Sequence, residues 1–313
     1  MKKYLLKRLM ISIVTLFCIV LVMFLLLNLM PGSPFQNEKL SPEQRALLLS
    51  KYGLDKSLPE RFFIYLKNLL KGDFGVSYSL AANVPISDLL KAHMPISMIL
   101  GFVAMVIGSL LGMSVGFFSA LAKDSIGDKL CSVLTIIGIS LPSYLFSIFF
   151  SYTLGFRTGT LPMLFEHSHP VLSSIMPVLS YALPVAAVVC RFTRDEAVSV
   201  MDSDYVLFAK SQGISGMRLL TGYILRNSLM PVITVIMMLL VGLLSGSMVT
   251  EQIFSIPGIG ALLTKAITAN DYNVVLALTF VFAFIFIAAR LLLDVLYGII
   301  DPRIRVSGKG GAR

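Results

Sequence analysis

The sequence is poor in charge and contains no tryptophan. Of its 313 residues, 14% are charged and 56% are hydrophobic, whereas a soluble domain of this size carries roughly 25% charged residues. Such a shortage of charge is typical of a chain whose solvent is mostly lipid. Because tryptophan is absent, tyrosine and phenylalanine have to supply any aromatic belt at the membrane interface.

The sequence also lacks the motifs of several enzyme and metal-binding classes. Its three cysteines, Cys18, Cys131 and Cys190, lie in or beside apolar runs without paired spacing, so they indicate neither a disulfide framework nor a zinc site. Two of its three histidines fall in residues 166–169, interpreted as a solvated loop because zinc sites ordinarily need three or four ligands. There is no HExxH motif and no P-loop. We therefore expect no metal site, no catalytic residue and no ATPase site in this chain, which is not expected to be an enzyme.

Acidic residues are scarce in the middle of the apolar runs, where ion-coupled transporters usually place them. Arg290 and Asp294 are the exception, and their spacing puts them on one helical face near the end of the last run. A self-neutralising pair near the interface is the expected role of these two residues. A chain that neither couples to ions nor hydrolyses nucleotide has to take any driving energy from a partner.

Six apolar runs in the sequence are long enough to cross a hydrocarbon layer of about 30 Å. They cover residues 9–30, 95–121, 131–155, 172–193, 231–250 and 274–298. The first run is too long for the apolar part of a signal peptide and no cleavage site follows it, so we expect an uncleaved span. The predicted fold class is an all-α membrane protein with six transmembrane helices.

Small residues recur along the second span, a pattern that favours close helix contact. They are Gly101, Gly108, Gly112 and Gly116. Prolines are expected to interrupt the third span at Pro142 and the fourth at Pro177 and Pro184. Proline at membrane depth is tolerated where protein or a water-filled cavity satisfies the freed carbonyls, so these positions point to a pathway.

Basic residues are distributed unequally between the two ends of the predicted spans. If the N-terminus is cytoplasmic, sixteen lysines and arginines fall in cytoplasmic segments, and the two short outer loops hold only Arg157 and Lys265. This bias follows the positive-inside rule and predicts that both termini are cytoplasmic. It also accounts for the net charge of +9, so we expect membrane lipid, and no nucleic acid, as a partner.

Residues 31–94 form a long extracytoplasmic segment in this arrangement. The stretch Ser41-Pro42-Glu43-Gln44 has the pattern of a helix start with a capping box, and the helix is expected to run to about Tyr52 and to stop at Gly53. Residues 60–70 carry an apolar stripe at helical spacing. That stripe fits either the core face of a small domain or a helix lying at the membrane surface.

The stretch 204–231, DYVLFAKSQGISGMRLLTGYILRNSLMP, is the main polar interruption in the C-terminal two-thirds of the chain. It falls on the cytoplasmic side. Its first part has helical spacing that Gly213 breaks, and a second helical piece over residues 215–229 is expected to stop at Pro231. On its own, the stretch fits an ordinary amphipathic loop. Between two spans of a charge-poor bundle, it also fits a lever for a partner that supplies energy.

Several motifs resemble the dipeptide, oligopeptide and nickel permease family of ABC importers. Residues 204–205, 209–213 and 225–231 are similar to that family's cytoplasmic EAA-type loop, in which the Glu-Ala-Ala and glycine positions match only at Ala209 and Gly213. Further resemblance lies at 52–56, 72–77, 251–260, 271–272, 294–298 and 301–305. The resemblance covers nearly the whole chain, and the best fit is the first of the two oligopeptide permease subunits.

The resemblance implies a type I ABC importer permease fold with an outer segment after the first helix. It implies a second homologous permease subunit that completes the translocation path, two ATPase subunits that bind ATP and Mg²⁺, and an extracytoplasmic peptide-binding protein. In that family the loop forms a coupling helix that sits in a groove of an ATPase subunit. No cofactor is therefore expected on this chain, and oligopeptides would cross the cytoplasmic membrane of a prokaryote by alternating access.

The residues expected to couple the chain to the ATPase are Asp204, Tyr205, Ala209, Lys210, Ser211, Gly213 and Arg218. Gly213 is expected where a Cβ would obstruct the turn, and Ala209 where the helix approaches the groove closely. Arg218 and Arg226 fit equally well as anchors to anionic lipid headgroups. The residues expected to line the translocation path are Pro142, Ser245 and Ser247.

These expectations divide the chain into the N-terminus and first span at 1–30, the extracytoplasmic segment at 31–94, a five-helix core at 95–301 with the coupling loop at 196–230, and a cytoplasmic tail at 302–313. Two alternatives stay open. Nickel or a nickel chelate is another cargo of the same family, although Met230, Met237 and Met248 spread over roughly 27 Å of helix, too far to share one metal. A stand-alone channel or an ion-coupled carrier is the alternative from a different class.

Overall fold

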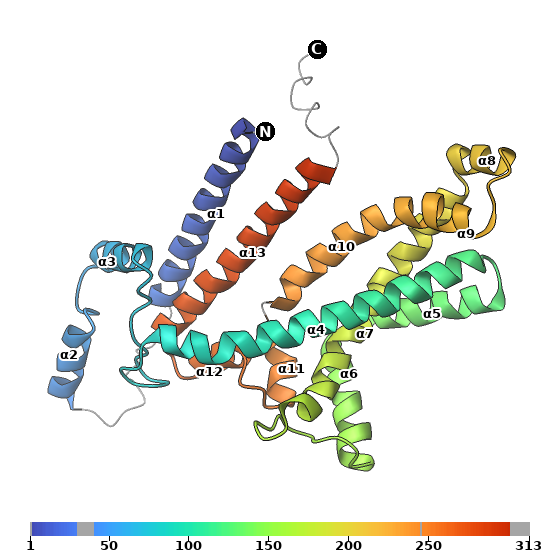
Figure 1. Ribbon diagram of the computed structural model, residues 1–313. Helices are drawn as coiled ribbons and strands as arrows, with labels where there is room; N and C mark the ends of the chain where they lie inside the picture. The colour runs from blue at the N-terminus through green and yellow to red at the C-terminus, as the bar shows by residue number, and fades with distance from the viewer. Residues whose placement is uncertain (1, 30–40, 245, 301–313) are drawn as a thin grey trace. The chain divides into compact units, whose positions relative to one another are not determined.

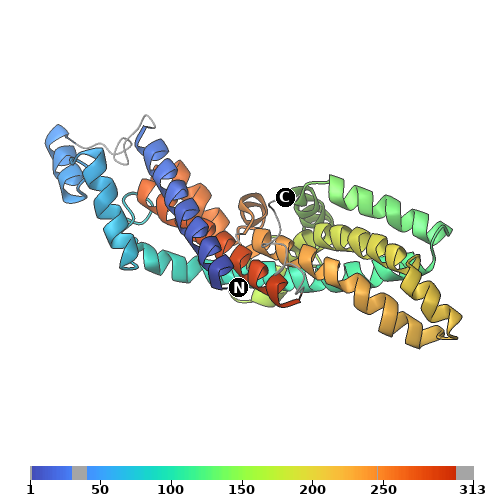
Figure 2. The ribbon, with the colours of Figure 1, turned by 90° about the horizontal axis from the view of Figure 1, so that it is seen from above.

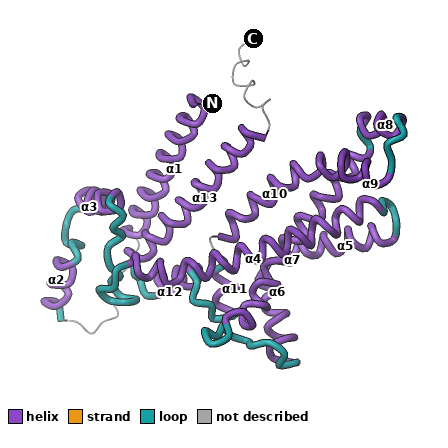
Figure 3. The backbone as a smooth tube through the Cα atoms, in the orientation of Figure 1, coloured by secondary structure: helices purple, strands orange, loops and turns teal. Residues whose placement is uncertain are grey.

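The structure is a computed structural model that describes residues 2–29, 41–244 and 246–300. Nearly all of these residues are helical, and among them the only extended pairing is an isolated bridge between Val76 and Pro85 (Figure 3). The all-α fold class expected from the sequence is confirmed, and the expected tail at 302–313 lies outside the described residues. The chain divides into two compact units, residues 1–96 with 257–313 and residues 97–256.

The first unit brings helices from the two ends of the chain together. It contains α1 (Lys2–Leu29), α2 (Pro42–Lys51), α3 (Leu58–Leu70), the first turns of α4 (Ile86–Leu121), α12 (Ile259–Thr268) and α13 (Tyr272–Ile300). Helices α1 and α13 lie side by side, as Figures 1 and 2 show. Apolar side chains from α1, α12 and α13 form one core, in which Ile259 and Leu278 are fully buried.

A buried aspartate ties the segment before α4 to the start of α13. The Oδ2 atom of Asp271 accepts hydrogen bonds from the Ser77 hydroxyl and from the backbone amides of Tyr78, Ser79 and Leu80, the amides at 2.9, 3.0 and 3.1 Å. These four donors replace the hydrogen bonds to water that the carboxylate loses on burial. Residues 77–80 are therefore fastened to α13 within this unit.

Both helices expected in the segment before α4 are present. The Ser41 hydroxyl accepts the Gln44 amide at 3.2 Å, and the Gln44 side chain accepts the Ser41 amide at 3.0 Å, so the expected capping box starts α2. Helix α3 has features of both roles that the sequence left open. Phe62 is buried in the core of the unit, whereas Phe63 and Leu70 are 68% and 83% exposed. One face of α3 therefore serves the core, and the other leaves apolar surface uncovered.

The second unit is a bundle arranged around α7 (Pro170–Met201). It also contains the rest of α4, α5 (Ile126–Ser140), α6 (Ser143–Phe150), the π-helical η1 (Ser151–Arg157), α8 (Asp204–Ser211), α9 (Gly216–Leu219), the π-helical η2 (Leu220–Leu225), α10 (Arg226–Leu244) and α11 (Met248–Ile253). Helices α5, α6 and α10 all pack against α7, which is the central helix of this unit.

Glycines on α4 allow the close helix contact that the sequence predicted. A Cβ atom at Gly108 would lie 2.6 Å from the Ala182 carbonyl oxygen of α7, and a Cβ atom at Gly112 would lie 2.6 Å from that of Ala186. Similar contacts occur at Gly101 against Leu243 of α10 and at Gly116 against Cys190 of α7. Since no larger side chain fits at these positions, α4 approaches its neighbours backbone to backbone.

Among the described residues, five helices are long and apolar enough to cross a membrane, or six if the bent pair of α5 and α6–η1 is one span. The two parts of that pair meet at an angle of 99°. Pro142 is the N-cap of α6, and Leu141 before it is extended because a residue that precedes proline is pushed out of the helical region. The expected interruption of the third span at Pro142 is confirmed.

Three other prolines do not break their helices, contrary to expectation. Helix α7 continues through Pro177 and Pro184, and α10 continues through Pro231, where the sequence predicted a stop. A proline removes one backbone hydrogen bond, whereas ending the helix would leave several carbonyls without partners in an apolar surrounding. Continuing the helix is therefore the less costly arrangement in these apolar segments.

Replacement of Gly112 by leucine is expected to separate α4 from α7. The new side chain would meet the Ala186 carbonyl, and overpacking of this kind costs about 1–3 kcal/mol or more. The measurement is the midpoint of thermal unfolding of detergent-purified protein, followed by the loss of its monodisperse peak on size exclusion. Gly222→Leu is the matched control, since nothing lies within 4 Å of a Cβ at Gly222. Equal midpoints for the two variants would contradict the close-packing account.

Candidate functional site

The segment between α7 and α10 forms a helical hairpin over residues 202–219, called the α8 hairpin below (Figure 1). Helix α8 starts after the extended N-cap Ser203 and carries Asp204 in its first turn, where a negative charge meets the positive end of the helix dipole. It ends in a turn in which the Gly213 amide donates to the Lys210 carbonyl at 3.0 Å. The helix, the glycine turn and the second helical piece expected from the sequence are all present.

One face of α8 is buried within the chain itself. Val206 is completely buried and Ala209 is 2% exposed, and both belong to a small core with Leu219 and Ile224 of the following helical turns. Phe117 and Met201 also pack against this core. Ala209 is therefore not available for the close approach to a partner that the sequence analysis assigned to it. A small residue is needed at position 209 because α8 packs closely against the helical turns that follow it.

The opposite face of α8 is exposed and carries two large apolar side chains among polar ones. Leu207 and Phe208 are 58% and 63% exposed. The predicted coupling residues that are also exposed are Asp204, Tyr205, Lys210, Ser211, Gly213 and Arg218. Leu207 and Phe208 were not among the residues predicted from the sequence. The signal for them was two large apolar residues in a short polar loop, at positions outside the buried face of the helix. An apolar surface on such a loop is a feature of docking sites.

Gly213 is required for a different reason from the one expected. Nothing lies within 4 Å of a Cβ placed on Gly213, so a side chain there would not obstruct the turn. The backbone instead has a φ of +78°, a left-handed conformation that glycine adopts without steric cost. The constraint at Gly213 is therefore conformational, and it sets the direction in which the chain leaves α8.

A buried ion pair holds the end of the bundle from which the hairpin extends. Asp128 of α5 is 3% exposed and accepts hydrogen bonds from the Nε and Nη2 atoms of Arg194 on α7, at 2.6 and 2.7 Å. The Ser119 hydroxyl and the Asp124 amide donate to the same carboxylate at 2.6 and 3.0 Å. Bidentate contact and two further donors satisfy a carboxylate that burial would otherwise destabilise.

The sequence did not indicate this pair, because Asp128 and Arg194 are 66 residues apart and come together only when α5 packs on α7. In the sequence, Arg194 was only one of the basic residues that indicate membrane orientation. A second contact lies nearer the hairpin, where Lys123 is 3.0 Å from Asp202, the residue that ends α7. Both partners of that pair are largely exposed, so it contributes little stability but restricts the link into α8.

The second unit also contains a cavity of about 330 Å³ between α6, α7 and α10. Ser143, Tyr181 and Ser247 supply its polar side chains, and Gly242 and Gly246 lie on its wall. Of the predicted path residues, Ser247 lines this cavity and Pro142 immediately precedes the lining residue Ser143, while Ser245 lies outside the described residues. The polar side chains of the cavity therefore come from the bent span, from α7 and from the N-cap of α11.

A buried carboxylate lies behind this cavity. Glu251 of α11 is 1% exposed, and the Ser97 hydroxyl donates to its Oε1 atom at 2.7 Å. A Cβ on Gly246, which has a φ of +71°, would lie 2.5 Å from the same oxygen. The sequence placed no acidic residue here, because Glu251 follows the end of the fifth apolar run. Across the described residues, no group of three or more His, Cys, Asp or Glu side chains is placed to hold a metal ion.

The chain is similar to known proteins along its whole length. Residues 108–306 match the family described as binding-protein-dependent transport system inner membrane component, and residues 1–100 match the N-terminal domain model of such membrane components. The dipeptide transport system permease protein of Lactococcus lactis is 39% identical over 306 residues, which cover 98% of this chain and 100% of the relative.

Two further similarities agree with this match. The oligopeptide transport system permease protein of Haemophilus influenzae is 35% identical over 97% of this chain and 100% of its own length. A solved structure, an amino acid ABC transporter with histidines, covers 68% of this chain and 95% of its own, with a TM-score of 0.56 and 13% identity. At that identity the solved structure supports the fold alone.

Removal of the charge at Asp128 is expected to loosen the end of the bundle. Asp128→Asn leaves the Arg194 guanidinium with only its exposed partner Asp195, and breaking buried pairs costs about 3–5 kcal/mol when burial is complete. Because Arg194 keeps 25% exposure, the lower end of that range is expected. The measurement is the thermal unfolding midpoint of the purified protein. Asp195→Asn removes a 58% exposed partner of the same arginine and should change the midpoint little, so equal losses in both variants would argue against the buried pair.

Proposed function

The chain belongs to the family of binding-protein-dependent transport system inner membrane components, and on this basis we propose that it is the transmembrane permease subunit of an ATP-driven importer of peptides. It is a multi-pass membrane protein, and we place it in the cytoplasmic membrane of a prokaryote. Relatives at 32–39% identity over nearly the whole chain are named for dipeptide or oligopeptide transport. These names favour a peptide cargo over nickel.

The observation that carries the coupling role is that α8 is buried on one face and exposed on the other. Its inner face is fixed to the chain's own core through Val206 and Ala209, while Leu207 and Phe208 are presented outward. A short helix held in this way transmits a force applied to its outer face into α7 and α10. A groove on an ATPase subunit is the occupant that the family membership supports, and helix-in-groove docking uses apolar anchors of this kind.

The proposed cycle rests on partner subunits that this chain does not contain. Two ATPase subunits would bind ATP and Mg²⁺, a second homologous permease would complete the path, and an extracytoplasmic peptide-binding protein would deliver the cargo. Closure of the ATPases on ATP would move the coupling helices and change which of two packings of the bundle is favoured. Transport by alternating access then requires no catalytic group, cofactor or metal from this chain.

The cavity in the second unit is the proposed contribution of this chain to the path. Hydroxyls from Ser143 and Ser247 offer hydrogen bonds that do not depend on the identity of the peptide side chains, while Val185, Val188 and Leu239 supply apolar wall. Such a lining suits a backbone that has to pass without being held tightly. Selection of the peptide is left to the binding protein.

Truncation of Phe208 is expected to uncouple the chain from its ATPase. Phe208→Ala should weaken co-purification of the ATPase at least tenfold, because exposed aromatic anchors at the centre of an interface typically contribute more than 1 kcal/mol. The measurement uses tagged chain expressed with its neighbouring open reading frames, followed by quantification of bound ATPase and of peptide-stimulated ATP hydrolysis.

Leu134→Ala is the control for the Phe208 experiment, since Leu134 is 60% exposed in the middle of α5, far along the helix from the hairpin. Equal ATPase recovery for the two variants would remove α8 as the contact. Absence of any ATPase with the wild-type chain would overturn the importer proposal itself and leave the channel or carrier alternative.

Substitutions of Gly213 separate conformation from contact. Gly213→Val forces a β-branched residue into φ +78°, a conformation that costs roughly 1–2 kcal/mol for residues with a Cβ, and should misdirect the hairpin. Gly213→Asn should retain coupling, because asparagine visits this conformation readily. ATP hydrolysis stimulated by peptide is the readout. If both variants lose activity equally, the glycine would be needed for contact with the partner and not for its φ angle.

A further inference from the structure

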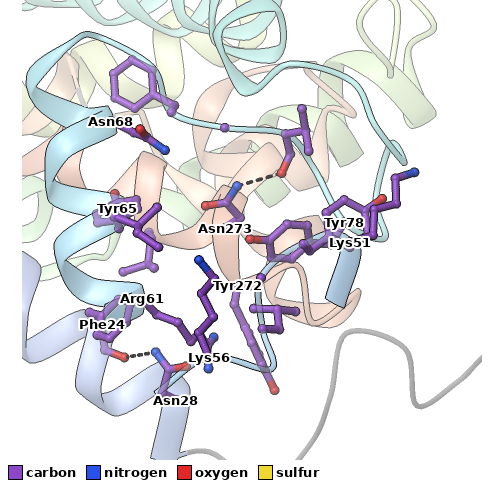
Figure 4. A pocket seen from close by; sticks show the side chains of 18 of the residues that line it. Phe24, Asn28, Lys51, Lys56, Arg61, Tyr65, Asn68, Tyr78, Tyr272 and Asn273 are labelled. Carbon is purple, nitrogen blue, oxygen red and sulfur yellow. Dashed lines mark hydrogen bonds between the residues drawn. The ribbon is translucent and has the colours of Figure 1, made fainter. Parts of the chain in front are cut away.

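The first unit contains a second cavity, of about 490 Å³, that the proposed transport role does not use. We call it the α3 cavity. Its walls come from the end of α1, the link after α2, α3, the segment 73–78 and the start of α13 (Figure 4). Figure 4 shows Arg61 reaching from α3 toward Lys56 in the middle of this group. Five separate segments therefore surround one space within the same compact unit.

Three of the four charged side chains that line the α3 cavity are cationic. Lys51, Lys56 and Arg61 face a single carboxylate, Asp73, which already accepts a hydrogen bond from the Gly75 amide at 2.8 Å. A cavity with this lining attracts anions and repels cations. The two lysines have partners of their own, because Lys56 lies 3.3 Å from the Glu60 carboxylate and Lys51 donates to Asn83 at 3.1 Å.

Arg61 is the lining cation whose guanidinium has no ion-pair or hydrogen-bond partner among the described residues. Among the residues that the structure describes, no carboxylate lies within ion-pair distance of its guanidinium, and the side chain is partly buried in the cavity wall. Desolvation by burial lowers the pKa of Arg61 below its usual value. The neighbouring Tyr78 supplies no negative charge, because burial raises its pKa to about 12 and keeps the phenol neutral at physiological pH. An anion inside the cavity would compensate the positive charge of Arg61 and replace the hydration that the side chain loses on burial.

The cavity lies where two candidate membrane spans end. Phe24 and Asn28 belong to the last turns of α1, and Tyr272 and Asn273 to the first turn of α13. Both helices qualify as spans by length and apolar character, over Leu6–Leu29 and Tyr272–Leu292. The phosphate groups of a bilayer lie just outside its hydrocarbon layer, at the depth where spans of matching length end. Tyr65 and Tyr272 on the cavity wall fit the same depth, since tyrosine is enriched at that interface.

Apolar surface borders the charged lining. Phe24 of α1, Ile64 of α3 and Leu276 of α13 line the cavity, and Ile64 is 40% exposed. These apolar side chains lie beside the charged groups of the cavity and form a surface suited to an acyl chain. A soluble anion would gain nothing from this surface, whereas an amphiphile with an anionic head would contact both parts.

The polar groups that remain indicate the kind of headgroup. The Asn28 side-chain amide donates to the Phe24 carbonyl at 2.7 Å, and the Asn273 amide donates to the Val76 carbonyl at 2.8 Å. Each asparagine therefore keeps its oxygen as an acceptor for a hydroxyl donor. A headgroup with hydroxyls fits these acceptors, and a headgroup with a quaternary or primary amine would be repelled by the cations.

We propose that the α3 cavity is a binding site for an anionic phospholipid of the phosphatidylglycerol type. Arg61 meets the phosphodiester through its planar fork, a geometry that arginine uses for bidentate phosphate contact. Lys51 and Lys56 add positive charge, the asparagine oxygens accept from the glycerol hydroxyls, and the acyl chains follow α1 and α3. The proposal is independent of the transported cargo and of the ATPase contact.

The test is lipid retention by the full-length chain, measured by native mass spectrometry in detergent with one added lipid at a time. Phosphatidylglycerol should remain bound at least tenfold more strongly than phosphatidylcholine or phosphatidylethanolamine. Arg61→Ala should lower phosphatidylglycerol retention at least tenfold, and Arg61→Lys should restore it in part. Lys67→Ala is the matched control, because Lys67 is exposed on the same helix and does not line the cavity. Thermal unfolding midpoints verify that each variant is folded.

Competition by glycerol 1-phosphate and inorganic phosphate distinguishes lipid from free phosphate. Neither soluble anion should displace the lipid at equal concentration, since neither carries acyl chains. Equal retention of zwitterionic lipid, unchanged retention in folded Arg61→Ala, or displacement by free phosphate at equal concentration would each overturn the proposal. Binding of a short peptide through its carboxylate in place of the lipid would overturn it as well.

Discussion

The bidentate contact between Asp128 and Arg194 is the interaction on which the arrangement of the second unit depends. Helices in an apolar surrounding gain little from burying further apolar surface, because lipid is as apolar as the helix faces. A buried charge pair with all its hydrogen bonds made is different, since α5 can leave α7 only by exposing an unpaired carboxylate. The pair therefore selects one packing of α5 on α7. It does so at the end of α7 that continues into the α8 hairpin.

Two further constraints make the bundle suited to transmitting movement. The glycines of α4 bring backbone against backbone along α7, so the two helices move together or not at all. The α8 hairpin is attached through a small apolar core around Val206 and Ala209, while Leu207 and Phe208 on its opposite face are exposed. A force applied to that face acts on α7 and α10 rather than on a loose loop. The cavity between α6, α7 and α10 lies within the same unit and would respond to such a movement.

Local patterns in the sequence predicted local structure well. The capping box at Ser41 and Gln44, the bend at Pro142 and the helix ending at Gly213 all depend on residues within a few positions of one another, so sequence alone suffices for them. Two predictions failed because they depend on the surroundings of a residue and not on its neighbours in the sequence. Proline was expected to break α7 and α10, but in apolar segments the intact helix satisfies more carbonyls than a broken one. Ala209 was assigned to a partner because a helical pattern does not show whether a partner or the chain's own core covers the residue.

The sequence by itself determined that this chain spans a membrane, where its apolar helices lie, and that a short helix with a glycine turn interrupts them. Composition and spacing carry that information because each span and each turn forms from consecutive residues. Only the tertiary structure decided which face of α8 is free, that Asp128 meets Arg194 across 66 positions, and that Arg61 lines a cavity without a carboxylate beside it among the described residues. Such contacts join residues distant in sequence, and no local pattern records the packing that brings them together.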